Sequence, residues 1–175
     1  MSPALDSDRI AADFIAACRA ELQALKPGNV HVFAAGHGMD VALFEAAALA
    51  AAPYISETDM PVGRRIHQAV KASFDRAGCN TNLGIVLLCA PLAKAAAETT
   101  FDVGLRRRLA VILSTLTIAD ADAAFAAIAY ANPAGLGSAE TGDVRKSADI
   151  TLLAAMSLAA DRDRIAHNYT TAFAD

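Results

Sequence analysis

Residues 83–97 read LGIVLLCAPLAKAAA, an apolar run with a single charged residue, Lys94. A helix that is apolar on most sides is typical of the centre of a fold, because it leaves no polar face for solvent. The run is shorter than the roughly 18 apolar residues that a transmembrane helix needs. It therefore predicts a buried, central helix in a globular domain.

Helical patterns continue on both sides of this run. Ile10, Phe14, Cys18, Leu22 and Leu25 recur at helical spacing, in a helix that ends at Lys26-Pro27. Further helices are predicted over 41–52 (ending at Pro53), 61–77 (closed by Gly78), about 102–116, 117–131 (with Thr117 and Asp120 as a capping box) and about 143–160, continuing towards 173. Strand-like alternation is nearly absent. We therefore expect one all-α domain over residues 1–175, a bundle of about seven to eight helices.

Composition and charge exclude several classes of protein. The 175 residues are 55% hydrophobic and 19% charged, which is too apolar for a disordered chain. Fifteen Lys and Arg against nineteen Asp and Glu give a net charge of −4, without the basic surplus of a nucleic-acid-binding protein. The one basic run, Arg106-Arg107-Arg108, is expected to be a solvated helix start, since consecutive helical residues point about 100° apart.

Cysteine usage and the N-terminus indicate a compartment. Cys18, Cys79 and Cys89 are an odd number with no disulfide or zinc spacing, and they are expected to be free thiols. The sequence MSPALDSDR lacks the basic region and apolar core of a signal peptide. We therefore expect a cytoplasmic protein without a membrane anchor.

Polar chemistry is concentrated in three predicted loops, of which the first contains KPGNVH (26–31) and GHGMD (36–40). Lys26 is suited to bind phosphate, and Gly28 beside Pro27 allows a ligand to approach the backbone closely. His31, His37 and Asp40 are residue types that bind metals. An ordinary turn after a helix, with Asp40 capping the next helix, explains the same residues, and both interpretations stay open.

The second loop is Asn80-Thr81-Asn82-Leu83-Gly84, at a predicted helix N-terminus, where free amides and the helix dipole favour an anion. Simple N-capping by Asn82 or Thr81 is the alternative. The third runs from Asn132 through two glycines to Glu140 and Asp143, carboxylates that suit a divalent cation or acid–base chemistry. Solvated loop carboxylates are the alternative there.

Together, the motifs resemble those of a known family. In chain order they are 26–31, 36–40, Asn80–Ile85, Pro133–Gly137 with Asp143-Val144, and Asp161–Asp163. In this order the chain resembles the triphosphoribosyl-dephospho-coenzyme A synthase family over nearly its whole length. Within the family it is similar to the branch with shorter motifs found in archaea and one-carbon-metabolising bacteria. Members usually continue beyond the position of Asp175, so we expect a form shortened at the C-terminus.

The resemblance implies an all-α transferase that joins ATP to 3′-dephospho-coenzyme A and releases adenine. The product, 2′-(5″-triphosphoribosyl)-3′-dephospho-coenzyme A, is the precursor of the prosthetic group of citrate lyase and malonate decarboxylase. Asn29-Val30-His31 and Asn82-Leu83 depart from the citrate-lyase-type motifs. These departures favour an alternative, a relative that uses another phosphoribosyl or nucleotide substrate in one-carbon cofactor biosynthesis. A non-catalytic helical binding protein is the third possibility.

Motif position also implies roles for individual residues. Asp40 and Asp143 are candidates for base or metal ligand, Glu140 for metal ligand, and His37 for protonating adenine or binding phosphate. Phosphate or substrate binding is assigned to Lys26, Gly28, Asn29, His31, Asn80, Thr81, Asn82, Gly84, Gly135 and Gly137. Mg²⁺ is expected to accompany ATP. The expected partners are these nucleotides and, from the apolar excess, a second copy of the chain, with no nucleic acid and no membrane.

Overall fold

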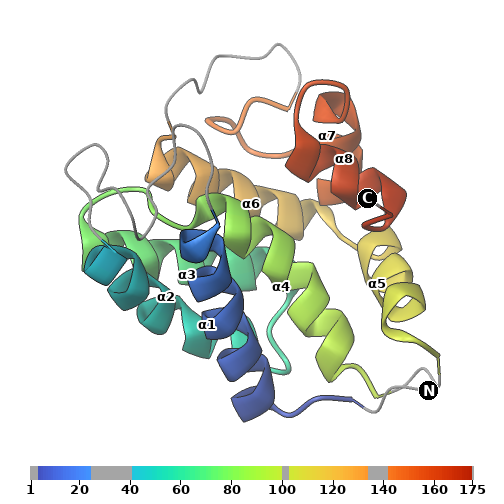
Figure 1. Cartoon of the computed structure of the whole chain (residues 1–175). Coiled ribbons are helices and arrows are strands. Elements are labelled where there is room, and N and C mark those ends of the chain that lie inside the picture. The colour runs from blue at the N-terminus through green and yellow to red at the C-terminus, as the bar shows by residue number, and fades with distance from the viewer. Residues whose placement is uncertain (1–3, 25–40, 100–102, 134–141, 175) are drawn as a thin grey trace.

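The computed structural model describes residues 4–24, 41–99, 103–133 and 142–174, and within these ranges it contains eight α-helices and no strand (Figure 1). The helices are α1 (Ser7–Gln23), α2 (Val41–Ser56), α3 (Val62–Ala77), α4 (Leu83–Ala97), α5 (Leu105–Ser114), α6 (Ile118–Ala131), α7 (Leu152–Ala159) and α8 (Arg164–Thr171). The predicted all-α fold is confirmed.

Helix α4 lies at the centre of the bundle, as its apolar sequence predicted. Val86, Ala90 and Ala95 have no exposed surface. Helices α1, α2, α3, α5 and α8 all pack against α4. Because neighbours surround it, α4 buries apolar side chains on several faces, which is the arrangement that stabilises a helix lacking a polar face.

Helices α1, α2, α3 and α4 alternate in direction. Arg19, near the end of α1, pairs with Glu45 near the start of α2 at 3.1 Å. Ser73, near the end of α3, donates a hydrogen bond to the carbonyl oxygen of Ala47 in the first half of α2 at 3.1 Å. Lys94, near the end of α4, donates to the Thr58 carbonyl just after α2 at 2.8 Å, so α4 runs parallel to α2.

Helix α6 runs parallel to α3. The Gly63 amide at the start of α3 donates to Asp120 Oδ1 at 2.8 Å, and the Tyr130 hydroxyl at the other end donates to Asp75 Oδ1 at 2.6 Å. A Cβ at position 63 would lie 2.4 Å from the Cα of Asp120, so only glycine permits this approach. The predicted capping box of Thr117 and Asp120 is confirmed at the start of α6.

This alternation places five helix termini at one end of the bundle. The ends of α1, α3 and α6 and the beginnings of α2 and α4 lie there. The first two loops predicted to carry the polar chemistry, between α1 and α2 and between α3 and α4, leave and rejoin the helices at these termini. The third loop leaves the end of α6 here but leads to α7, whose first residue, Leu152, donates to the Thr117 carbonyl at the opposite end of α6 at 3.2 Å. This end of the fold thus holds both attachments of two motif-bearing loops and one attachment of the third.

Two predicted helix boundaries were wrong. Helix α2 does not stop at Pro53 but continues to Ser56. Pro53 removes only the helical hydrogen bond to the Leu49 carbonyl, and the helix continues on both sides of that gap. Arg65 then donates to the carbonyls of Ile55, Glu57 and Met60, which have no helical partner at and after the helix end. Its positive charge also suits the C-terminal end of the helix dipole.

The single long helix predicted from about 143 is replaced by turns and two short helices. Asp143 Oδ1 accepts a hydrogen bond from the Arg145 amide at 3.0 Å, and Asp122 Oδ1 accepts from the Ala148 amide at 2.6 Å. Such side-chain acceptors compete with helical hydrogen bonds. Helix α7 therefore begins only at Leu152, and Asp163 caps a separate α8.

The basic run at the start of α5 is not uniformly solvated. Arg106 and Arg107 are exposed, but Arg108 is 3% exposed and donates to the Glu98 carbonyl at 2.8 Å. The expectation of a solvated run was therefore wrong for Arg108, because the helix turns that side chain towards α4.

Among the described helices, none is by itself long and apolar enough to cross a membrane. Helices α5 and α6 reach that length and apolar content only when taken together, and the pair is bent by 95°.

Candidate active site

Nine of the predicted site residues lie outside the described residues: Lys26, Gly28, Asn29, His31, His37, Asp40, Gly135, Gly137 and Glu140. The described members are Asn80, Thr81, Asn82, Gly84 and Asp143. The first four form a continuous segment, while Asp143 lies on a different part of the chain.

The Asn80 loop is a tight connection between α3 and α4. Gly78 ends α3 with φ +71°, a left-handed conformation that glycine adopts readily, and its amide donates to the Phe74 carbonyl at 2.7 Å. Asn80 is partly exposed, and its Oδ1 accepts from the Leu83 amide at 3.3 Å. The loop therefore places the first amides of α4, which have no partner within the helix, at the loop end of the bundle.

Asn82 points into the bundle rather than towards solvent. It is 7% exposed and, although it occupies the N-cap position of α4, its side chain makes no capping hydrogen bond. Its amide group lies 3.4 Å from Ser73 Oγ, and the orientation that satisfies both ends places the oxygen 3.2 Å from the Ala48 amide nitrogen. Asn82 thus joins α4 to α2 and α3, which is a positioning role.

Thr81 contributes a buried hydroxyl without a hydrogen-bond partner among the described residues. It belongs to a shallow pocket of about 160 Å³, open to solvent, between the loop and α3 and α6. The lining residues are Val70, Ser73, Phe74, Cys79, Asn80, Thr81, Asn82, Leu83 and Ala131. The pocket combines an apolar wall with hydroxyl and amide groups, but it is well below the roughly 300–1,000 Å³ of a small-molecule site, so a ligand would have to bind across its mouth.

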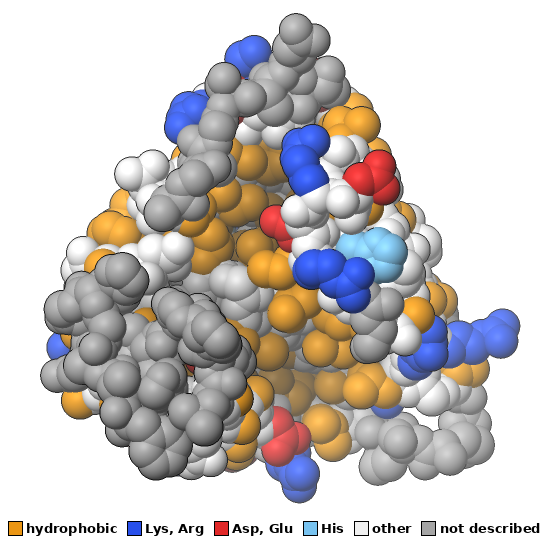
Figure 2. All heavy atoms as spheres, turned by 45° about the horizontal axis from the view of Figure 1, so that its top comes forward, with side chains coloured by type: hydrophobic (Ala, Val, Ile, Leu, Met, Phe, Trp, Pro, Cys, Tyr) orange, Lys and Arg blue, Asp and Glu red, His pale blue; other side chains and the backbone are white. Residues whose placement is uncertain are grey.

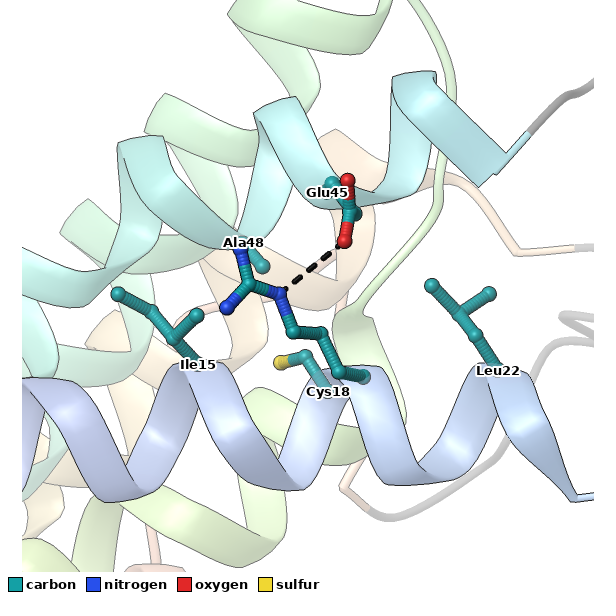
Figure 3. Close-up of a pocket in the computed structure, with 6 residues that line it drawn as sticks. Ile15, Cys18, Leu22, Glu45 and Ala48 are labelled. Carbon is teal, nitrogen blue, oxygen red and sulfur yellow. Dashed lines mark hydrogen bonds and ion pairs between the residues drawn. The ribbon is translucent and has the colours of Figure 1, made fainter.

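A second groove runs between α1 and α2 towards the same end (Figure 3). Ile15, Leu22 and Ala48 line it with Cys18, and the exposed Arg19–Glu45 ion pair spans it. Burial raises the pKa of the Cys18 thiol to about 12, so this sulfur is a packing group rather than a nucleophile. Arg19 is the positive charge of the groove.

Asp143 is connected to the start of α4 through α7 and α8. A Cβ added at neighbouring Gly142 would lie 3.7 Å from Leu158 of α7. Ile165 of α8 in turn lies against Gly84, with its Cδ1 3.2 Å from the position of a Cβ there. The structure therefore places the segment of Asp143 against α7, which packs on α8, the helix that contacts the first turn of α4.

The face formed by these elements is hollowed. Figure 2 shows a hollow with a hydrophobic floor, and positively charged, acidic and histidine side chains stand along one side of it. A surface of this kind suits a ligand that has both apolar and anionic parts. In the described part of the chain, no group of three or more His, Cys, Asp or Glu side chains could hold a metal ion.

Two residues near this end were not singled out from the sequence. Arg19 lies on the exposed side of α1, where charged residues are common and do not by themselves indicate a functional site. Ser73 interrupts the apolar stripe of α3 and is 3% exposed. A buried serine in such a stripe is the signal that would have indicated its hydrogen bond to the Ala47 carbonyl and its contact with Asn82.

The fold and the site define an all-α protein with a candidate anion-binding end. The family model CitG, described as ATP:dephospho-CoA triphosphoribosyl transferase, matches residues 7–175. The chain therefore belongs to the CitG family and is a triphosphoribosyl transferase, as the resemblance of its motifs implied. Comparison with curated proteins and with solved structures finds no match. The family assignment does not favour the alternatives of a different substrate or a non-catalytic protein.

Proposed function

We propose that the end of the bundle at which α1, α2, α3, α4 and α6 meet is the site of triphosphoribosyl transfer from ATP to 3′-dephospho-coenzyme A. The observation that supports this proposal is the alternation of helix direction, which brings both attachments of the first two motif-bearing loops, and the start of the third loop, to one end. The shallow pocket at Thr81 opens at this end, beside the first turn of α4.

In this reaction, the bond between ribose C1′ of ATP and adenine breaks. A bond forms between that C1′ and the 2′-hydroxyl oxygen of dephospho-coenzyme A, the hydroxyl proton passes to a base, and adenine takes up a proton as it leaves. We assign the base to Asp40 or Asp143 and the acid to His37. A carboxylate beside C1′ also stabilises the positive charge that develops there.

The triphosphate is assigned to the first turn of α4 with Asn80, Thr81 and Gly84. Helix amides without a partner inside the helix and the positive end of the helix dipole favour phosphate there, and the Thr81 hydroxyl has no hydrogen-bond partner among the described residues. Lys26, Gly28, Asn29, His31, Gly135 and Gly137 are assigned to the same substrates from their motifs.

Mg²⁺ is proposed to enter as part of the MgATP substrate. This ion is commonly held by one or two carboxylates together with substrate phosphates, so a complete protein cage is not required. Asp143, with Asp40 and Glu140, supplies carboxylates of this kind. The three free cysteines suit a reducing compartment, which supports a cytoplasmic location.

Mass spectrometry of a reaction with MgATP and 3′-dephospho-coenzyme A tests the proposed function. We expect free adenine together with the triphosphoribosyl adduct. Asp143→Asn is expected to lower kcat by about 10²-fold or more, in the range of a lost acid–base group. Asp149→Asn, an exposed carboxylate of the same segment, is the matched control.

The possible outcomes distinguish an error in the assigned catalytic residue from an error in the assigned acceptor substrate. Full activity in Asp143→Asn would remove this residue from the catalytic site. A folded protein that binds MgATP but releases no adenine with this acceptor would show that the acceptor is different. The motif departures at Asn29-Val30-His31 favour that second candidate function, a relative acting on another phosphoribosyl or nucleotide acceptor.

A further inference from the structure

Pro91 interrupts the backbone hydrogen bonding of α4 near its middle. In an α-helix the amide of residue 91 would donate to the carbonyl of residue 87, but proline has no amide hydrogen. Leu87 is 6% exposed, so its carbonyl is largely shielded from water. A buried carbonyl without a partner is costly, and a donor must come from elsewhere.

Tyr169 of α8 supplies that donor. Its hydroxyl donates to the Leu87 carbonyl oxygen at 2.7 Å, and the residue is 1% exposed. Burial raises the pKa of the Tyr169 hydroxyl, which therefore stays protonated. The hydrogen bond joins residues 82 positions apart and fixes α8 to the middle of α4 at one point.

The beginning of α8 is fixed in the same way over the beginning of α4. Asp163 Oδ1 accepts from the amides of Ile165 and Ala166 at 2.7 and 3.0 Å. These bonds set the first turn of α8, which presents Ile165 to Gly84. Helix α8 is thus held by Tyr169 at its far end and lies on the first turn of α4 at its near end.

We propose that Tyr169 is a positioning residue for triphosphoribosyl transfer. Its hydroxyl holds α8 on α4, and α8, through Ile165, holds the first turn of α4 where the triphosphate binds. The inference rests on the proposed function, because that turn is part of the proposed site. It also gives the Asp161-Arg162-Asp163 motif a structural purpose, since Asp163 sets the turn that carries Ile165.

A substitution at Pro91 distinguishes two roles of the Tyr169 hydroxyl: holding α8 on α4, or only satisfying the Leu87 carbonyl. Tyr169→Phe leaves the Leu87 carbonyl unpaired and also releases α8. Adding Pro91→Ala restores the amide at residue 91, which satisfies the carbonyl without α8. Pro91→Ala alone keeps both partners, because a carbonyl oxygen accepts two hydrogen bonds.

We expect Tyr169→Phe to lower Tm and to raise the KM for MgATP about tenfold or more, as small displacements at a site do. The double variant should recover most of the Tm and keep the raised KM. Recovery of KM together with Tm would show that the hydroxyl serves only to satisfy the carbonyl, and would overturn the proposal. A loss of folded protein alone would lower kcat and leave KM unchanged.

Two further variants complete the test. Ile165→Ala removes the contact with Gly84 without touching the Leu87 carbonyl, and it is expected to raise KM at equal folded fraction, together with a lower Tm from the lost packing of this partly buried side chain. If Tyr169→Phe does not fold, this variant alone tests whether α8 positions the first turn of α4. Asn80→Ala reports on the proposed site itself: an unchanged KM there means that the triphosphate does not bind at the first turn of α4, whereas absence of adenine release is the failure of the proposed function. A raised KM in Asn80→Ala with unchanged KM in Tyr169→Phe and Ile165→Ala contradicts only the role of α8.

Discussion

Asn80 and Asn82 lie two residues apart in one loop, but their environments differ. Asn82 is buried between α2, α3 and α4, whereas Asn80 is partly exposed at the mouth of the pocket. Asn82→Ala removes a buried amide group and its hydrogen bonds to the Thr81 carbonyl and the Ala48 amide, so we expect a loss of about 1–3 kcal/mol in the free energy of unfolding. Urea denaturation measures it.

Asn80→Ala is the matched control for that measurement. It removes the partly exposed Asn80 side chain, whose oxygen accepts one hydrogen bond, and should lower the free energy of unfolding less than Asn82→Ala does. When the two variants are compared at the same fraction of folded protein, Asn80→Ala should weaken MgATP binding more. The reverse order, with Asn80 the more important for stability, would contradict the assignment of one asparagine to the ligand and the other to the fold.

The three cysteines are also expected to differ in reactivity, because they differ in burial. Burial raises the pKa of Cys18 to about 12 and that of Cys89 to about 11, whereas Cys79 lies in the partly exposed Asn80 loop. At pH 8 a thiol with a pKa near 11 is roughly one part in a thousand thiolate, the reactive form. We expect iodoacetamide to label Cys79 first in the native protein and all three thiols in urea.

Labelling of Cys18 or Cys89 at the rate of Cys79 would show that the packing of α1 and α4 opens frequently. Saturating MgATP provides a second comparison. Since Cys79 lines the pocket next to Asn80 and Thr81, the ligand is expected to slow its labelling.

At the level of helices, the parallel contact of α3 with α6 depends on a single glycine. Gly63→Ala would place a Cβ 2.4 Å from the Asp120 backbone, which cannot be relieved by rotating a side chain. We expect a loss of about 1–3 kcal/mol from overpacking, measured as a shift of the urea midpoint. Gly104→Ala is the control, because a Cβ there meets nothing within 4 Å. Equal midpoints for the two variants would contradict the close packing.

The sequence predicted those helices whose boundaries are set by neighbouring residues. The extent of α4 follows from its apolar run, and the start of α6 follows from the Thr117–Asp120 capping box. The continuation of α2 past Pro53 could not be predicted, because it depends on Arg65 from the next helix. The turns after Asp143 likewise depend on Asp122, whose position on α6 is not visible from local sequence.

The same distinction holds for the candidate site. The Asn80 loop could be recognised because a polar cluster before an apolar helix is a local signal. The inward direction of Asn82 required Ala48 and Ser73 from two other helices. The link between Tyr169 and Leu87 spans 82 residues, and the only local sign of it was a proline inside an otherwise helical pattern. Long-range partners therefore account for what the sequence did not reveal.

On the scale of the whole molecule, the alternating helices give the bundle two chemically different ends. The loop end carries the Asn80 segment and the Arg19–Glu45 pair. The opposite end is held by backbone acceptors, since Lys94 donates to the Thr58 carbonyl and Arg108 to the Glu98 carbonyl. Exposed apolar side chains such as Leu49 and Leu158 are spread over different helices, and a homodimer stays a prediction.

This difference between the two ends predicts which backbone amides will exchange more slowly when the ligand binds. Hydrogen–deuterium exchange with MgATP is expected to show protection in 79–86 and at the start of α2, and little change in 57–61 and 103–106 at the opposite end. The physical reason is that phosphate oxygens bound to the first amides of α4 reduce local opening only in the helices packed there. Mg²⁺ alone is the control, because without a triphosphate it should leave both ends unchanged. Protection confined to 57–61 and 103–106 would place the nucleotide at the wrong end of the bundle, and the proposed site would have to be abandoned even if the chain released adenine.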